Sequence, residues 1–132
     1  MTAYRFPVSV KGVVLRDGRV ILLKNDRGEW ELPGGKLEPA ETPEACVARE
    51  IAEELGLRVS VSGIIDSWVY SAKPERPVLI VTYGCAELTQ GEPVLSSEHE
   101  DLAWFPLGDV DALRMPAGYK RSIAAWARQL RS

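Results

Sequence analysis

Three glutamates near the middle of the chain, Glu50, Glu53 and Glu54, have the spacing to act together. On a helix that turns about 100° per residue, their carboxylates fall within one stripe roughly 100° wide. Like charges one turn apart repel each other, and the helix dipole disfavours anions near a helix C-terminus. A hard divalent cation such as Mg²⁺ reverses this cost, because it prefers carboxylate oxygen ligands. The stripe therefore predicts either a magnesium site or a solvated glutamate face.

The segment that carries these acids has the pattern of one amphipathic helix, Pro43–Leu55. Thr42 can cap the first free amides, and proline is tolerated at the first helical position. Apolar residues then recur every four positions, and Gly56 provides a left-handed stop after the last of them. Six glutamates and one arginine lie between Glu38 and Glu54, so the negative charge of the chain is concentrated around this helix.

The rest of the chain must supply the scaffold that positions this helix. Asp17-Gly18 predicts a tight hairpin turn, and the Pro-Gly-Gly run at residues 33–35 predicts a loop that ends any strand there. A second amphipathic helix is expected at residues 117–130, with Leu130 among its inward residues. Strands are predicted at residues 8–15, 20–23, 29–32, 58–61, 63–70, 78–86 and 102–105. This order predicts an α/β (α+β) fold in which helices cover a central mixed sheet, an α/β/α sandwich.

Composition limits the class of protein further. With 132 residues, 45% of them hydrophobic and 27% charged, the chain is expected to form one globular domain over residues 1–132. A net charge of −3 offers no basic excess for binding a nucleic-acid polymer, and no stretch approaches the roughly 18 apolar residues of a membrane span. Cys46 and Cys85 are expected to be reduced core thiols, and the lack of a signal-peptide pattern predicts a cytoplasmic protein.

Residues 35–57 resemble the Nudix box, G-x5-E-x7-R-E-U-x-E-E-x-G-U with U a bulky aliphatic residue. All nine constrained positions agree: Gly35, Glu41, Arg49, Glu50, Ile51, Glu53, Glu54, Gly56 and Leu57. A chance match in a chain of this length is on the order of 10⁻⁸ at average residue frequencies. The resemblance implies a Mg²⁺-dependent hydrolase, with Mn²⁺ as a substitute, that cleaves a pyrophosphate bond in a nucleoside diphosphate linked to another group. Nucleoside triphosphates, ADP-ribose and nucleotide sugars all fit that description.

The resemblance also implies roles for residues in the box. Glu53 and Glu54 match the principal metal ligands of the family. Glu50 matches a carboxylate that either binds metal or accepts a proton from the attacking water. Gly35 matches a glycine whose carbonyl adds a ligand and whose missing side chain lets phosphates come close. Arg49 matches an arginine that braces the site through carboxylate hydrogen bonds.

Residues around these positions are further candidates. Glu41 is expected to support the site or to add a ligand, and Lys36 could neutralise a phosphate oxygen. The Ser-Glu-His-Glu run resembles a later loop from which family members supply one more glutamate, with Glu98 as the first candidate and Glu100 as its rival. His99, between them, is expected at the surface. Four aromatic residues could stack on a base or pack in the core: Trp30, Trp68, Tyr70 and Tyr83.

Two alternatives to an enzyme stay open. A Nudix-fold module without catalysis could bind a nucleotide as a sensor, although such modules often lose box acids and this box is complete. A metal-free acidic stripe would instead indicate a protein-interaction domain. The expected partner is a small nucleotide, and the resemblance also suggests a homodimer.

Overall fold

The computed structural model describes residues 5–132. Strands alternate with two α-helices and one short 3-10 helix, η1. The elements are β1 (Val8–Arg16), β2 (Arg19–Lys24), β3 (Trp30–Glu31), β4 (Gly34–Lys36), α1 (Pro43–Leu55), β5 (Arg58–Tyr70), β6 (Val78–Thr89), β7 (Asp101–Pro106), η1 (Leu107–Ala112) and α2 (Ala117–Arg131).

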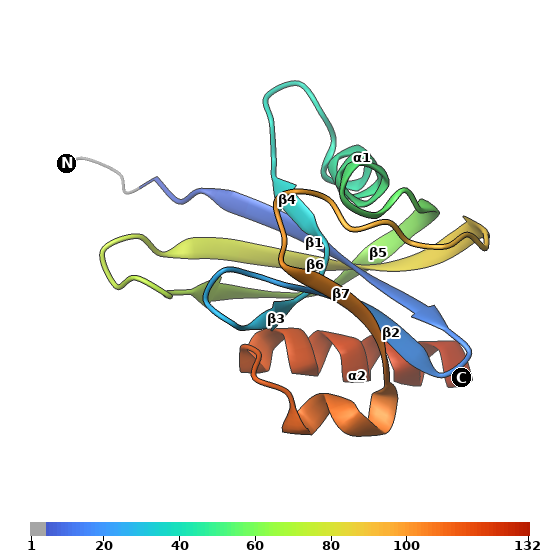
Figure 1. Ribbon diagram of the computed structural model, residues 1–132. Helices are drawn as coiled ribbons and strands as arrows, with labels where there is room; N and C mark the ends of the chain where they lie inside the picture. The colour runs from blue at the N-terminus through green and yellow to red at the C-terminus, as the bar shows by residue number, and fades with distance from the viewer. Residues whose placement is uncertain (1–4) are drawn as a thin grey trace.

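The strands form one mixed sheet between two helical layers. Its order is β3-β2-β1-β6-β5, with β4 paired to β1 and β7 paired to β2. The β1–β6 pair is parallel, as in the Val10↔Val81 register, and the other pairs are antiparallel. Helix α1 covers one face of the sheet and α2 covers the other (Figure 1). The predicted α/β/α sandwich with a mixed central sheet is thereby confirmed.

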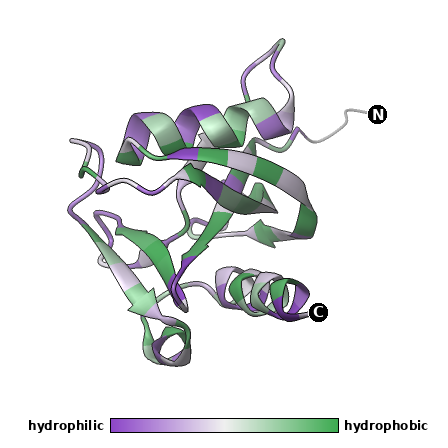
Figure 2. Ribbon diagram, turned by 90° about the vertical axis from the view of Figure 1, so that its right-hand side faces the viewer, coloured by the Kyte–Doolittle hydropathy of each residue, from purple (hydrophilic) through white to green (hydrophobic). Residues whose placement is uncertain are grey.

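Side-chain alternation along the strands divides the core into two layers. In β1, Val10 and Val14 face the α1 side, whereas Val13 faces the α2 side. Figure 2 shows hydrophobic strand segments enclosed between the two helices. Full burial of one such aliphatic side chain is worth about 1.5–3 kcal/mol, so each layer anchors its helix firmly.

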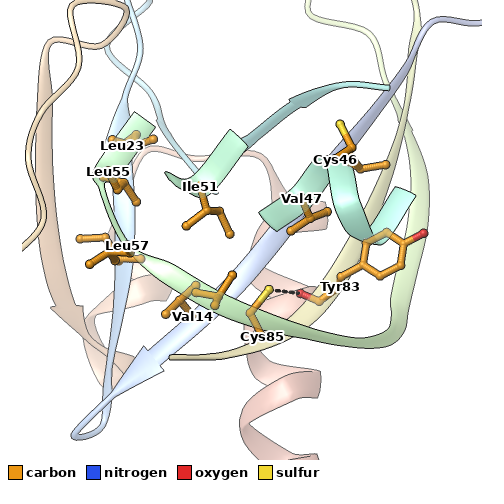
Figure 3. Packing of buried hydrophobic residues seen from close by; sticks show 12 residues of the cluster. Val14, Leu23, Cys46, Val47, Ile51, Leu55, Leu57, Tyr83 and Cys85 are labelled. Atoms are coloured by element: carbon orange, nitrogen blue, oxygen red, sulfur yellow. Dashed lines mark hydrogen bonds between the residues drawn. The ribbon is translucent and has the colours of Figure 1, made fainter. Parts of the chain in front are cut away.

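The α1 layer fixes the helix that carries the acids. Val47, Ile51 and Leu55 are fully buried against the sheet (Figure 3). Cys46 and Cys85 belong to the same layer and are free thiols, as expected, and burial raises the pKa of the Cys85 thiol to about 12. With its apolar face held in this way, α1 directs Glu50 and Glu54 toward β4 and the loop that precedes β7.

Local signals set the ends of α1 as predicted. The Thr42 Oγ1 accepts a hydrogen bond from the Ala45 N–H at 3.1 Å. Gly56 adopts the left-handed region with φ 69°, and its N–H donates to the Ala52 carbonyl. The observed helix, Pro43–Leu55, has the predicted bounds.

The structure corrects the prediction that the Pro-Gly-Gly run opens a loop. Gly34 and Gly35 lie instead in β4, which pairs with β1 through Val10↔Gly35 and Lys11↔Gly34. A Cβ on Gly34 would lie 2.1 Å from the Val10 carbonyl oxygen. The glycines therefore allow two strands to approach closely, a use that a sequence cannot distinguish from flexibility.

Two smaller expectations also need correction. The predicted strands at 58–61 and 63–70 form a single strand, β5, because Gly63 lies in a register shift between Val61 and Ile64 and does not end the pairing. Helix α2 runs to Arg131, one residue beyond the predicted end, and Leu130 in its last turn is 56% exposed and not inward. None of the helices in residues 5–132 is long and apolar enough to cross a membrane.

Candidate active site

The acidic face of α1 lies directly against β4. A Cβ on Gly35 would lie 2.6 Å from the carboxyl carbon of Glu50, so only glycine fits beneath this carboxylate. The pairing of β4 with β1 holds the Gly35 backbone in place. The strand and the helix thus bring the first glycine of the motif and its central glutamate into contact, although 15 positions in the sequence separate them.

Four residues form what we call the outer cluster: Arg49, Glu41, Glu50 and Glu53. Arg49 donates from Nη2 to Glu41 Oε1 at 2.8 Å and from Nε to Glu41 Oε2 at 3.1 Å, a bidentate pairing. Its Nη1 donates to Glu50 and Glu53 at 3.1 Å. The Arg49 guanidinium lowers the pKa of the Glu41 carboxyl to about 2. The arginine thus holds three carboxylates together on a half-exposed surface.

Glu54 lies on the opposite, buried edge of the acidic face. Its side chain is 4% exposed, against 59% for Glu53, so the stripe predicted from the helical spacing spans a boundary between solvent and core. Glu54 Oε1 accepts a hydrogen bond from the Gly34 N–H at 2.8 Å. Burial raises the pKa of Glu54 to about 7, against the lowering effect of Lys11 and of the Gly34 N–H.

Glu54 ends a series of charged groups that are buried or mostly shielded from solvent, which we call the inner chain: Lys11, Glu31, His99 and Glu54. Lys11 Nζ lies 3.5 Å from Glu31 Oε2, His99 Nε2 lies 3.2 Å from the same oxygen, and His99 Nδ1 lies 3.5 Å from Glu54 Oε2. Burial alone would raise the pKa of Glu31, but His99 and Lys11 outweigh it and lower that pKa to about 2. The same hydrogen bond with Glu31 has the opposite effect on the histidine and raises the pKa of His99.

The position of His99 contradicts the expectation of a surface residue. Its side chain is only 9% exposed and lies between two carboxylates that come from β3 and α1. The expectation failed because neither partner is near His99 in the sequence. Lys11, Glu31 and Asn25, which donates to Glu31 Oε1 at 2.8 Å, were missed altogether. One signal was available for Lys11, because it interrupts the apolar run of β1 at a position that shares a face with Val13.

The two groups of charges meet at a cavity of about 200 Å³. Its lining consists of Glu50, Glu53, Glu54, Ser96, Ser97 and Glu98. The loop before β7 therefore brings Glu98, the first of the two candidates, beside the acids of α1. Its rival Glu100 is exposed and is not part of this lining, and its backbone N–H donates to the Lys24 carbonyl. Lys36 is exposed at the end of β4, directly after Gly35.

The donors around this cavity are of the type that a hard divalent cation prefers. Four carboxylates line it, and Gly35 leaves open the space that a side chain would fill. Within residues 5–132, no three acidic, histidine or cysteine side chains are already grouped closely enough to hold a metal ion. Glu50 and Glu53 are instead engaged with Arg49. The chemistry of the residues fits a metal ion, and the arginine competes for two of them.

A second cavity, of about 330 Å³, opens beside the inner chain. Lys11 and Glu31 contribute its charged wall, and Tyr70 and Tyr119 contribute aromatic surface. Lys73 and Arg76, from the segment between β5 and β6, also line it. It therefore combines flat apolar surface with polar groups, which is typical of a small-molecule site.

The structure places only one of the four candidate stacking aromatics in this second cavity. Tyr70 lines it, and its hydroxyl donates to Glu29 at 2.9 Å. Trp30 packs edge-on against Phe105, and Trp68 does so against Tyr119. Tyr83 is buried in the α1 layer, where the Cys85 thiol donates to its carbonyl (Figure 3).

Comparison with known proteins agrees with this fold. The NUDIX domain model matches residues 5–126. A MutT-like protein of Streptomyces ambofaciens is 42% identical over 105 residues, covering 78% of this chain and 66% of that relative. A Mycobacterium tuberculosis protein that carries the name 8-oxo-dGTP diphosphatase 2 is 33% identical over 125 residues, covering 89% of this chain and 87% of that relative.

Solved structures show the same architecture. The crystal structure of a MutT NUDIX hydrolase from Burkholderia pseudomallei aligns with a TM-score of 0.77 and 28% identity, over 92% of this chain and 98% of its own. The fold, the acidic helix and these matches together define a pyrophosphohydrolase, an enzyme that acts on phosphoric anhydrides. The chain belongs to the Nudix family.

Proposed function

We propose that this protein hydrolyses a pyrophosphate bond of a nucleoside diphosphate derivative with the help of Mg²⁺, for which Mn²⁺ can substitute. One observation carries the proposal: Glu50, Glu53, Glu54 and Glu98 line a single cavity, and Gly35 lies beneath Glu50. The name of the Mycobacterium tuberculosis relative refers to 8-oxo-dGTP, so a nucleoside triphosphate is the first substrate to test.

The chemical problem is the negative charge of the substrate. Phosphate oxygens repel a nucleophile, so the site needs positive charge and a means of removing a proton from water. A divalent cation bound there would offset that charge and make water easier to deprotonate. In this proposal Glu53, Glu54 and Glu98, together with the Gly35 carbonyl, would hold the cation. Because Glu50 accepts a hydrogen bond from Arg49 and also lies against Gly35, it serves either as a further ligand or as the proton acceptor.

Two cations of the chain have supporting roles. Arg49 orients Glu41, Glu50 and Glu53 through hydrogen bonds of 2.8–3.2 Å and keeps their mutual repulsion tolerable. Lys36, exposed next to Gly35, neutralises a phosphate oxygen of the substrate or of the departing group. No covalent enzyme intermediate is required, because water attacks phosphorus directly.

The cavity beside the inner chain would receive the part of the substrate that is not cleaved. It has aromatic surface from Tyr70 for a flat ring and a charged wall for polar atoms at the edge of that ring. The sequence-based predictions of a single domain, a homodimer, no nucleic-acid polymer as partner and a cytoplasmic location complete the proposal.

A substrate panel tests the proposal directly. Purified protein is incubated with Mg²⁺ and nucleoside triphosphates, oxidised dGTP, ADP-ribose, nucleotide sugars or diadenosine polyphosphates, and the products are identified. Nucleoside monophosphate plus pyrophosphate supports the triphosphate assignment, and AMP plus ribose 5-phosphate moves it to ADP-ribose. EDTA is expected to abolish turnover and excess Mg²⁺ or Mn²⁺ to restore it. Metal-independent turnover overturns the reaction class, and binding without any turnover supports the sensor alternative.

A further inference from the structure

His99 is buried in an arrangement that its own loop does not explain. Its side chain is 9% exposed, and Nδ1 forms no hydrogen bond among the described residues although it is shielded from solvent. Its partner across this gap is Glu54 Oε2, at 3.5 Å. A buried polar atom without a full hydrogen bond is costly, so this position needs a reason beyond packing.

The Nε2 side of the His99 ring is fixed by its contact with Glu31. Nε2 lies 3.2 Å from Glu31 Oε2, and Glu31 is itself held by Asn25 at 2.8 Å and Lys11 at 3.5 Å. The backbone is tied as well, because the next residue donates its N–H to the Lys24 carbonyl of β2 at 3.0 Å. The imidazole therefore presents Nδ1 to Glu54 from a fixed direction.

The Glu54 carboxylate is contacted by groups from two separate segments, β4 and the loop before β7. The Gly34 N–H of β4 donates to Oε1 at 2.8 Å, and the His99 ring faces Oε2. Each carboxylate oxygen can accept more than one hydrogen bond, so both keep a lone pair for another partner. Two-sided contact fixes the plane of the carboxylate, which would otherwise turn about its last side-chain bond.

We propose that His99, held by Glu31, is a positioning residue that orients the Glu54 carboxylate for binding the divalent cation. The inference rests on the proposed function, because it assigns Glu54 as a ligand. Orientation in advance raises affinity, because the side chain loses less freedom when the cation binds. His99 itself does not contact the cation in this arrangement; it acts through Glu54.

Metal affinity measured without substrate tests this role. Mn²⁺ binding is followed by the electron paramagnetic resonance signal of free Mn²⁺ for the wild type and for His99→Ala, His99→Asn and His99→Gln. We expect His99→Ala to weaken Mn²⁺ binding about tenfold, the scale typical for residues that orient metal ligands. The amide nitrogen of asparagine can take the place of Nδ1 and that of glutamine the place of Nε2, so His99→Asn should retain more affinity than His99→Gln.

Controls separate positioning from a structural role. Thermal unfolding with EDTA reports the stability of each metal-free variant, and a purely structural role would lower it without changing the Mn²⁺ affinity of the folded protein. Glu92→Gln removes an exposed acid of the same loop and should bind Mn²⁺ like the wild type. Wild-type affinity in His99→Ala, or equal affinities in the asparagine and glutamine variants, overturns this inference alone. Absence of Mn²⁺ binding in the wild type overturns the proposed function as well.

Discussion

Two neighbouring carboxylates of α1, Glu53 in the outer cluster and Glu54 in the inner chain, lie in opposite environments. In the outer cluster, Arg49 and its three acids lie within 13 consecutive residues of the sequence and remain partly open to solvent. In the inner chain, the four charged groups come from β1, β3, α1 and the loop before β7, and their side chains are at most 16% exposed. The cavity lies where the two groups meet.

This contrast allows one site to combine carboxylates that can rearrange with one that is held in place. Partly exposed ion pairs contribute little to stability and can rearrange, so under the proposed function Arg49 can release Glu50 and Glu53 to a divalent cation. Buried charges must keep their partners, because removing one partner leaves an uncompensated charge in the core. The inner chain therefore holds Glu54 in place while the outer cluster supplies carboxylates that can move.

The largest expected effect comes from the outer cluster. Glu53→Gln should lower kcat by at least about 10²-fold, the scale of losing one key electrostatic group, without changing the melting temperature appreciably. Steady-state kinetics and thermal unfolding are measured together. Glu44→Gln, which removes an exposed acid from the first turn of α1, is the matched control with near wild-type kcat. Near-normal turnover in Glu53→Gln would falsify the assignment of this residue.

The inner chain should instead make a contribution to the free energy of unfolding that depends on pH. The pKa of Glu31 is lowered to about 2 in the folded state, so its stabilisation is present above its unfolded value of 4.5 and is lost as the pH falls toward 2. Glu31→Gln should be less stable than the wild type by about 2 kcal/mol at pH 7, and the two should converge toward pH 2. Urea unfolding over this range, with the exposed loop variant Glu75→Gln as control, makes the measurement. A difference that does not vary with pH contradicts the charge argument.

The contact between β4 and α1 can be broken by one methyl group. Gly35→Ala would place a Cβ 2.6 Å from the Glu50 carboxyl carbon and push that carboxylate away. We expect kcat/KM to fall on the order of tenfold, equivalent to about 1.4 kcal/mol. Gly63→Ala is a suitable control, because its Cβ would meet nothing within 4 Å. Equal kinetics for the two variants would show that Glu50 tolerates displacement.

The smallest effect concerns the helix and not the charges. Thr42→Ala removes the side-chain acceptor of the Ala45 N–H and should lower the free energy of unfolding by about 1 kcal/mol. Because the apolar face still anchors α1, kcat should not change. Thr42→Ser keeps the acceptor and should restore most of the stability, as measured by urea unfolding. A fall in kcat for Thr42→Ala would mean that the start of the helix affects the acids at its end.

Several features followed from local sequence because local interactions determine them. The cap at Thr42, the stop at Gly56 and the four-residue apolar spacing predicted the bounds of α1 correctly, since these signals act within a few residues. The strand assignment of Gly35 and the burial of His99 could not be predicted in the same way. Both depend on contacts with β1 and β3, which lie far away in the sequence.

The sequence was enough to predict candidate site residues, through the spacing of the acids in the box, the helix that displays them and the arginine within reach of them. Tertiary structure alone decided that Glu54 is buried while Glu53 is exposed, that Glu98 and not Glu100 lines the cavity, and that Lys11, Glu31 and His99 form one chain. The physical reason is that helical periodicity is a property of neighbouring residues. Burial and charge pairing arise only when distant strands and loops pack against one another.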